Sequence, residues 1–214
     1  MSNVIDDSKK GFLKFVPAGQ NSKEIEILQY LTQINSPQNH TVSGVRIWPV
    51  RGGDVISMPT AGTWITELRD PTPQLLSVAK QLFEAVNFMH QHGVAHMDLK
   101  PGNILVPLNG GRLSIIDFYT SVRVKGVESM FNGVVGTTGY IAPEVAAGRG
   151  QFSAIRADLW SCGKTLSQFC KRCRPSADRD MLLEIVGQLM DKDPKKRPMM
   201  SDVLERINDT PLEG

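Results

Sequence analysis

Short apolar runs separated by turn residues dominate the first 60 positions of the chain, a pattern typical of β-strands. Residues 11–16 form an apolar run that is interrupted by one lysine and ended by a proline. Residues 46–50 and 54–58 form two further runs, with Gly52 and Gly53 between them. This stretch therefore predicts three short strands, the last two joined as a hairpin.

Two segments in the first half of the chain repeat apolar residues at helical spacing. Residues 23–34 predict a helix with Asn21 or Ser22 as its N-terminal cap. A longer segment predicts a helix with Thr72 as its cap and Gly93 at its end. A proline directly after the cap favours a helix start, and a glycine favours a helix end.

The second half of the chain predicts another hairpin, a long loop and several helices. Residues 104–107 and 112–116 predict two strands around a turn at 109–111. Residues 117–140 are rich in glycine, serine, threonine and valine without periodicity, which indicates a loop. Helices are predicted at 156–170, at 177–190 with Ser176 as cap, and at 201–208 with Ser201 as cap. Strands first and helices later indicate the α+β class.

The chain has 214 residues, of which 41% are hydrophobic and 21% charged, enough to bury a core within one domain. Its net charge of +2 is too small to favour binding to nucleic acid or to a membrane. No apolar run is long enough to span a bilayer, and the first residues lack an apolar signal core. The three cysteines do not form an even disulfide set, which favours reduced thiols and an intracellular location, cytoplasmic or nuclear.

One motif carries candidate chemistry, because residues 96–106 place an aspartate, a lysine and an asparagine at fixed spacing before an apolar strand. The motif His-Met-Asp-Leu-Lys-Pro-Gly-Asn resembles the catalytic loop H-R-D-L-K-P-x-N of eukaryotic-type protein kinases. The resemblance implies that Asp98 is the catalytic base and that Lys100 neutralises the transferring phosphoryl group. It also implies that Asn103 binds magnesium and that ATP is the second cofactor.

A second motif, Ile-Ile-Asp-Phe-Tyr at 115–119, resembles the D-F-G motif that follows an apolar strand in the same family. The resemblance implies that Asp117 binds magnesium between the phosphates and that Phe118 packs beneath it. Tyr119 replaces the glycine of the motif, so we expect the backbone there to be restricted to one arrangement.

Two further motifs resemble structural parts of protein kinases. Residues 136–144 resemble G-T-x-x-Y-x-A-P-E of the Ser/Thr type, in which Thr137 shapes the acceptor site. The resemblance also implies that Glu144 pairs with a buried Arg197. Asp158 begins a segment similar to D-x-W-S-x-G and is expected to hold the catalytic loop through backbone N–H groups.

The lysine expected to bind the nucleotide phosphates is the weakest part of the resemblance. Lys14 follows Phe-Leu on the first predicted strand, and Glu24 begins a match to E-x-x-I-L on the following helix. In the family such a lysine binds the α- and β-phosphates and is held by the glutamate. Lys9 and Lys10 are competing candidates, and a lone Lys–Glu pair is otherwise a solvated surface contact.

The resemblance also places an adenine site after the third predicted strand. Met58 is expected at the back of the pocket, and Pro59 can still offer its carbonyl although it has no N–H. Ala61 would supply both an N–H and a carbonyl, and Leu105 would pack under the base.

The fold implied is a bilobal kinase-like α+β domain over 1–214, with a truncated β-rich N-lobe to about residue 60 and a mostly helical C-lobe over about 61–209. Three departures stand out: no G-x-G-x-x-G roof over the nucleotide, Met97 in place of the H-R-D arginine, and a short segment after Cys170. The segment 37–40 and the Met-Pro pair ending the third strand also resemble kinase-like proteins of mushroom-forming fungi.

The leading hypothesis is an ATP- and magnesium-dependent Ser/Thr protein kinase with a protein substrate and a regulatory partner chain. The alternative is a pseudokinase, a binding or scaffold module of the same fold, favoured by Tyr119 and Met97. A kinase of small molecules is less favoured, because Lys100 and the segment 136–144 resemble a platform for protein substrates.

Overall fold

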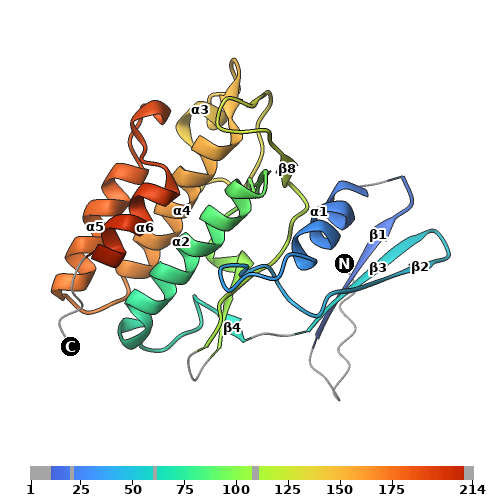
Figure 1. The fold of residues 1–214 in the computed structure, drawn as a ribbon, viewed down its shortest axis with the longest axis horizontal. Helices are drawn as coiled ribbons and strands as arrows, with labels where there is room; N and C mark the ends of the chain where they lie inside the picture. Colours follow the sequence, from blue (N-terminus) through green and yellow to red (C-terminus); the bar gives the residue numbers. More distant parts are fainter. Residues whose placement is uncertain (1–10, 20–21, 60–61, 108–110, 210–214) are drawn as a thin grey trace.

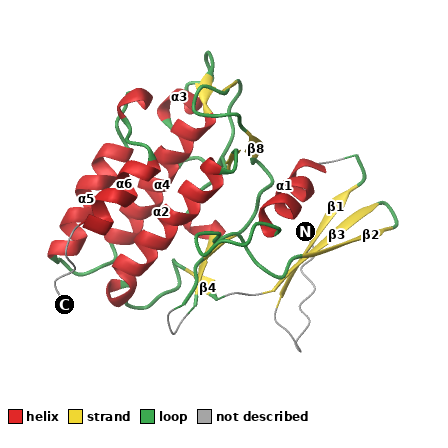
Figure 2. Ribbon diagram, in the orientation of Figure 1, coloured by secondary structure: helices red, strands yellow, loops and turns green. Residues whose placement is uncertain are grey.

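The computed structural model describes residues 11–19, 22–59, 62–107 and 111–209. A strand-rich part with one helix lies beside a larger part built mostly of helices (Figure 1; Figure 2). The predicted α+β class is confirmed. No helix in the described ranges is long and apolar enough to cross a membrane.

The strand-rich part contains a three-stranded antiparallel sheet in the order β1-β3-β2. Its strands are β1 (Gly11–Pro17), β2 (Arg46–Val50) and β3 (Gly53–Pro59), close to the predicted bounds. The predicted hairpin is present, and Gly52 in its turn has a φ of +89°, which glycine adopts without strain.

Helix α1 (Ser22–Thr32) follows β1 and ends two residues before the predicted boundary. The amide of Asn39 explains this end, because its Nδ2 donates to the carbonyls of Leu31 and Ile34 at 2.8 and 2.9 Å. These bonds satisfy carbonyls that a helix end leaves free. The predicted caps, Asn21 and the side chain of Ser22, lie outside the described residues.

Helix α2 (Leu75–Gln91) is preceded by a 3₁₀ turn, η1 (Thr72–Gln74). Thr72 as the cap was wrong, because this residue lies inside the turn and its hydroxyl accepts from the Arg174 N–H at 3.0 Å. Gly93 after the helix has a φ of +67°, which confirms the predicted stop.

The remaining helices belong to the helical part, where α5 and α6 lie at the end away from the strand-rich part (Figure 1). The cap Ser176 is confirmed, since its side chain accepts from Arg179 N. Ser201 as a cap was wrong, because this residue lies within the first turn of its helix. The elements are α3 (Pro143–Ala146), α4 (Ala154–Cys170), α5 (Ala177–Leu189), η3 (Pro194–Lys196) and α6 (Met200–Asp209).

Short strands order the chain around the predicted motifs. The predicted hairpin is present as β6 paired with β7, although its turn at 108–110 lies outside the described residues. The predicted loop also contains β8 and β9, which pair with segments far away in sequence. The strands are β4 (Thr63–Trp64), β5 (Val94–Ala95), β6 (Ile104–Val106), β7 (Ser114–Ile115), β8 (Val122–Arg123), β9 (Met130–Phe131) and β10 (Phe152–Ser153).

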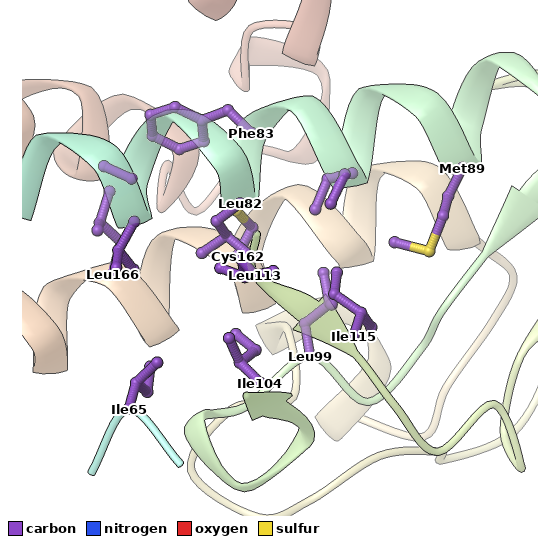
Figure 3. Packing of buried hydrophobic residues seen from close by; sticks show 14 of the residues in the cluster. Ile65, Leu82, Phe83, Met89, Leu99, Ile104, Leu113, Ile115, Cys162 and Leu166 are labelled. Carbon is purple, nitrogen blue, oxygen red and sulfur yellow. The ribbon is translucent and has the colours of Figure 1, made fainter. Parts of the chain in front are cut away.

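A continuous hydrophobic core joins α2 and α4 to the strands that carry the catalytic motif (Figure 3). Phe83 and Leu82 of α2 and Leu166 of α4 are completely or almost completely buried. Leu99 and Ile115 come from the two motif segments and are also wholly buried, so the core fixes the loops that hold the candidate site. The three cysteines are free and buried, and burial raises the pKa of Cys170 to about 11.

Candidate active site

A buried carboxylate on α4 holds the segment that resembles a catalytic loop. Asp158 accepts hydrogen bonds from the backbone N–H groups of His96 and Met97 at 2.6 and 2.7 Å. Met97 has a φ of +67°, a left-handed conformation that costs about 1–2 kcal/mol for a non-glycine residue. The two charge-assisted hydrogen bonds offset that cost and fix where the following side chains point.

His96 is enclosed completely and acts as part of the scaffold. Its Nε2 lies 3.1 Å from the carbonyl of Ile116, and its Nδ1 accepts from the N–H of Asp98 at 3.2 Å. Burial lowers the pKa of His96, so the imidazole is neutral with its proton on Nε2. The ring thereby joins the catalytic-loop segment to the segment before Asp117.

The side chains predicted for phosphoryl transfer lie together. Lys100 Nζ donates to Asp98 Oδ2 at 2.6 Å and to Thr137 Oγ1 at 2.7 Å. Asn103 Nδ2 donates to the Asp98 backbone carbonyl at 2.9 Å. The second carboxylate oxygen, Asp98 Oδ1, is buried without a partner among the described residues. It is an acceptor of the kind that a substrate hydroxyl would satisfy.

A second cluster joins the strand-rich part to the D-F-G-like motif. Lys14 Nζ donates to Glu24 Oε1 at 2.8 Å and to Asp117 Oδ1 at 2.9 Å, across 103 positions of sequence in the latter case. The predicted Lys14–Glu24 contact is therefore present, whereas Lys9 and Lys10 lie outside the described residues.

Burial and charge act in opposite directions on this cluster. Burial alone would lower the pKa of Lys14, but the hydrogen bonds and charges of Glu24 and Asp117 outweigh it and raise the pKa. Burial likewise favours a higher pKa for Asp117, but Lys14 holds it below its usual value. The cluster thus contains a protonated amine beside an ionised carboxylate, and the amine is positioned for an anionic group.

The donor set of the predicted metal site fits magnesium. The backbone segments that carry Asn103 and Asp117 are adjacent, since the Ile116 N–H donates to the Asn103 carbonyl at 3.0 Å. One amide oxygen and one carboxylate suit a hard ion that takes most remaining ligands from water and phosphate. Within the described ranges, no group of three or more His, Cys, Asp or Glu side chains could bind a metal on its own.

Two of the predicted adenine residues, Met58 and Leu105, come from two different sheets. Met58 lies opposite Phe12 in the register of β1 and β3, and Leu105 lies opposite Trp64 in the register of β4 and β6. The rings of Phe12 and Trp64 are 5.8 Å apart, which brings the two sheets into contact. Sequence analysis missed the role of these two aromatic residues, because no local motif marks them.

The predicted adenine set also contains Pro59 and Ala61. Pro59 ends β3 and lies opposite Gly11, and its side chain is exposed. Ala61 lies outside the described residues.

Tyr119, which replaces the glycine of D-F-G, lies beside the lysine of the second cluster. Its side chain is 57% exposed, and its ring centroid is 5.3 Å from Lys14 Nζ. A cation at this distance is attracted by the face of the ring. Asp117, two residues before Tyr119, has a φ of +65°, so the backbone of the motif is held in a left-handed conformation at a non-glycine residue.

The predicted pair of Glu144 with Arg197 is confirmed. Arg197 Nη1 and Nη2 donate to the two carboxylate oxygens of Glu144 at 2.7 and 2.8 Å. Arg197 is 1% exposed and also donates to the carbonyls of Asp191 and Arg156. This pair fixes the segment with α3 to the helical part of the molecule.

Residues 60–181 match the protein kinase domain family, which is more than half of the chain. The chain therefore belongs to the protein kinase family. The match contains the clusters around Asp98 and Asp117, whereas Lys14 and Glu24 lie before it.

Individual relatives are named as protein kinases, two of the three below as serine/threonine-protein kinases. CBL-interacting serine/threonine-protein kinase 12 of Arabidopsis thaliana is 30% identical over 231 residues, which cover 94% of this chain and 45% of that protein. CBL-interacting protein kinase 5 of Oryza sativa subsp. japonica is 33% identical over 187 residues, covering 84% and 38%. Serine/threonine-protein kinase chk1 of Schizosaccharomyces pombe is 43% identical over 84 residues, covering 39% and 16%.

The chain spans less than half the length of each of these relatives. Two of the three come from plants and one from a fission yeast. The predicted resemblance to mushroom-forming fungi and the predicted lack of a Gly-rich loop find no support in these matches.

Proposed function

We propose that the chain transfers the γ-phosphate of ATP to a serine or threonine hydroxyl of a protein, with magnesium as the metal cofactor. One observation carries the proposal above the others. Lys14 Nζ contacts both Glu24 and Asp117, so residues from β1, α1 and the D-F-G-like motif meet at one ammonium group. Such convergence is required of a phosphate site and is not needed for the fold alone.

The residues have separate tasks in this proposal. Asp98 Oδ1, buried without a partner among the described residues, accepts the proton of the attacking hydroxyl. Lys100, 2.6 Å from Asp98 Oδ2, places positive charge beside the oxygen that attacks. When bound, Mg-ATP supplies the phosphoryl group, and Asn103 and Asp117 would hold its metal ion. Thr137 contacts Lys100 and orients it toward the acceptor.

Lys14 and Glu24 complete the nucleotide site, with Lys14 binding the α- and β-phosphates. Met58, Pro59, Ala61 and Leu105 are proposed to enclose adenine. Support comes from the strand pairing, which places Met58 beside Phe12 and Leu105 beside Trp64, and from the aromatic contact between those two rings.

We further propose that residues 1–214 act as one kinase domain, with an N-lobe to about residue 60 and a C-lobe over about 61–209. The N-lobe would hold β1, α1, β2 and β3. Two relatives are named as CBL-interacting kinases, which gives a precedent for a regulatory partner chain. We include such a partner and a protein substrate in the proposal without specifying either.

A pseudokinase that binds a nucleotide or a partner is the second candidate. The observation that favours it is Tyr119, whose ring lies 5.3 Å from Lys14 Nζ where the family has glycine. An aromatic side chain there can restrict how phosphates approach the lysine.

The test is a thermal-shift titration with ATP, with and without magnesium, followed by a transfer assay with a generic protein substrate. A ligand that binds only the folded state raises the midpoint by mass action. We expect a magnesium-dependent shift and transfer that Asp98→Asn abolishes while ATP binding is retained. Binding without transfer in the wild-type chain would favour the pseudokinase, and equal transfer by the variant would exclude Asp98 as the base.

A further inference from the structure

A groove of about 430 Å³ separates α1 from the segment that carries β8 and β9. Ile27 and Tyr30 line it from α1, whereas Val122, Arg123 and Phe131 line it from the opposite side. Figure 1 shows α1 standing between the sheet and β8. Leu28 and Leu31 on the buried face of α1 pack in the core, and contacts that cross the groove add to what fixes the helix.

One side chain crosses this groove. The guanidinium carbon of Arg123 lies 4.0 Å from the ring centroid of Tyr30, and Arg123 Nη1 donates to the carbonyl of His92 at 3.1 Å. His92 is the C-terminal cap of α2, where carbonyls carry partial negative charge. Arg123 is therefore bound to α1 through Tyr30 and to the end of α2 through a carbonyl.

The backbone of Arg123 is fixed by strand pairing, so its side chain can hold α1 in place. Arg123 pairs with Val94 in the register of β5 and β8, and the next residue donates to the Gly93 carbonyl at 2.9 Å. Strand β5 leads directly into the segment held by Asp158. The stack on Tyr30 thus connects α1 to the backbone that carries the catalytic-loop motif.

The position of α1 matters because it carries Glu24. Glu24 Oε1 receives the hydrogen bond of Lys14, but its other oxygen is buried without a partner among the described residues. The placement of this carboxylate consequently depends on where α1 lies. Met97 is apolar and cannot bind a phosphate group, so the position of the H-R-D arginine does not supply a cation that would order the loop after phosphorylation.

We propose that Arg123 is a positioning residue whose stack on Tyr30 holds α1 against β8 and keeps Glu24 on Lys14 without phosphorylation. The link to catalysis rests on the proposed function, whereas the link between Arg123 and the position of α1 does not. The Lys14–Glu24 contact would then form without phosphorylation of the loop 117–140.

The test compares Arg123→Ala and Tyr30→Leu with two controls. Tyr30→Phe keeps the aromatic face, and Lys23→Ala removes another cation that lines the same groove. Amide hydrogen exchange of α1 and calorimetric binding of Mg-ATP are measured on the full chain, together with the melting temperature. A transfer assay separates KM for ATP from kcat.

We expect Arg123→Ala and Tyr30→Leu to speed amide exchange in α1 by about two- to fivefold, the factor that one exposed cation–π contact supplies. Exchange in α4 and α5 stays unchanged. KM for ATP and the Kd for Mg-ATP rise by a similar factor with little change in kcat. Arg123→Ala combined with Tyr30→Leu should be no worse than either change alone, because both remove the same contact.

Two results would overturn the proposal: unchanged exchange in α1 for both variants, or Tyr30→Phe behaving like Tyr30→Leu. Faster exchange in all helices with a lower melting temperature would show a general structural role and would also overturn it. If wild-type chain fails to bind Mg-ATP, the proposed function fails, while exchange in α1 still decides whether Arg123 holds the helix.

Discussion

Replacing Glu144 by alanine is the most direct test of how the helical part is held together. The substitution leaves the guanidinium of Arg197 in a site where that residue is 1% exposed. Two hydrogen bonds of 2.7 and 2.8 Å and one neutralising charge are lost. The variant therefore creates a buried cation whose counter-charge is gone.

The expected loss follows from the environment of the pair. Breaking a buried ion pair costs about 3–5 kcal/mol. Arg197 keeps its bonds to the carbonyls of Asp191 and Arg156, and the Glu144 side chain is 18% exposed, so the low end applies. At about 2–4 °C per kcal/mol for a chain of this size, a loss of about 3 kcal/mol lowers the melting temperature by about 6–12 °C.

The assay is thermal unfolding followed by circular dichroism, with urea unfolding as a second measure. Glu144→Gln is the matched control, because it keeps an acceptor but removes the charge, and should lose about half as much. Adding Arg197→Met to Glu144→Ala should recover part of the loss, since the buried charge is removed as well. A decrease below about 2 °C for Glu144→Ala would refute the reasoning.

Three further predictions concern the site and pH. Asp117→Asn should abolish the magnesium dependence of ATP binding, and unchanged dependence in calorimetry would exclude this metal site. Asp158→Asn should destabilise the chain by about 2–4 kcal/mol in urea unfolding, because one oxygen that accepts from His96 or Met97 becomes a donor. His40 and His96 have pKa values lowered from 6.5, mainly by burial, so stability is full above pH 6.5 and falls below it by up to about 1.4 kcal/mol per pH unit for each. Urea midpoints should fall from pH 7 to pH 5, less steeply for His40→Gln, and equal midpoints would contradict the sign.

Local sequence patterns predicted the elements whose signals are local. Alternation and turn glycines located β1, β2 and β3, and helical spacing located α2, α4 and α5 to within a few residues. Two caps were wrong, and the strands β8 and β9 within the predicted loop 117–140 were missed. Thr72 and Ser201 are suitable cap residues, but Thr72 bonds to the distant Arg174 and Ser201 lies one residue inside its helix. A cap depends on where neighbouring segments arrive, and spacing alone does not contain that information.

Motif spacing identified side chains that the fold brings together, but not the geometry that makes them useful. The sequence analysis named Asp98, Lys100 and Asp117, and the structure places the first two in contact. Nothing local predicted that Met97 and Asp117 adopt left-handed backbone conformations. Such conformations persist where surrounding contacts over-determine them. Here Asp158 accepts a hydrogen bond from the N–H of the first, and Lys14 binds the carboxylate of the second.

Met97 and Arg123 both bear on what keeps the loop 117–140 ordered. The loop 117–140 contains only two-residue strands, so charged contacts add to the hydrophobic packing that keeps it ordered. Met97 cannot make such a contact, whereas Arg123 binds an aromatic face on α1 and a carbonyl at the end of α2. Arg123, which lies in the loop 117–140 itself, thus supplies the cation between α1 and the end of α2. A cation–π contact does not depend on adding a phosphate group, so the order it imposes would persist in the unmodified chain.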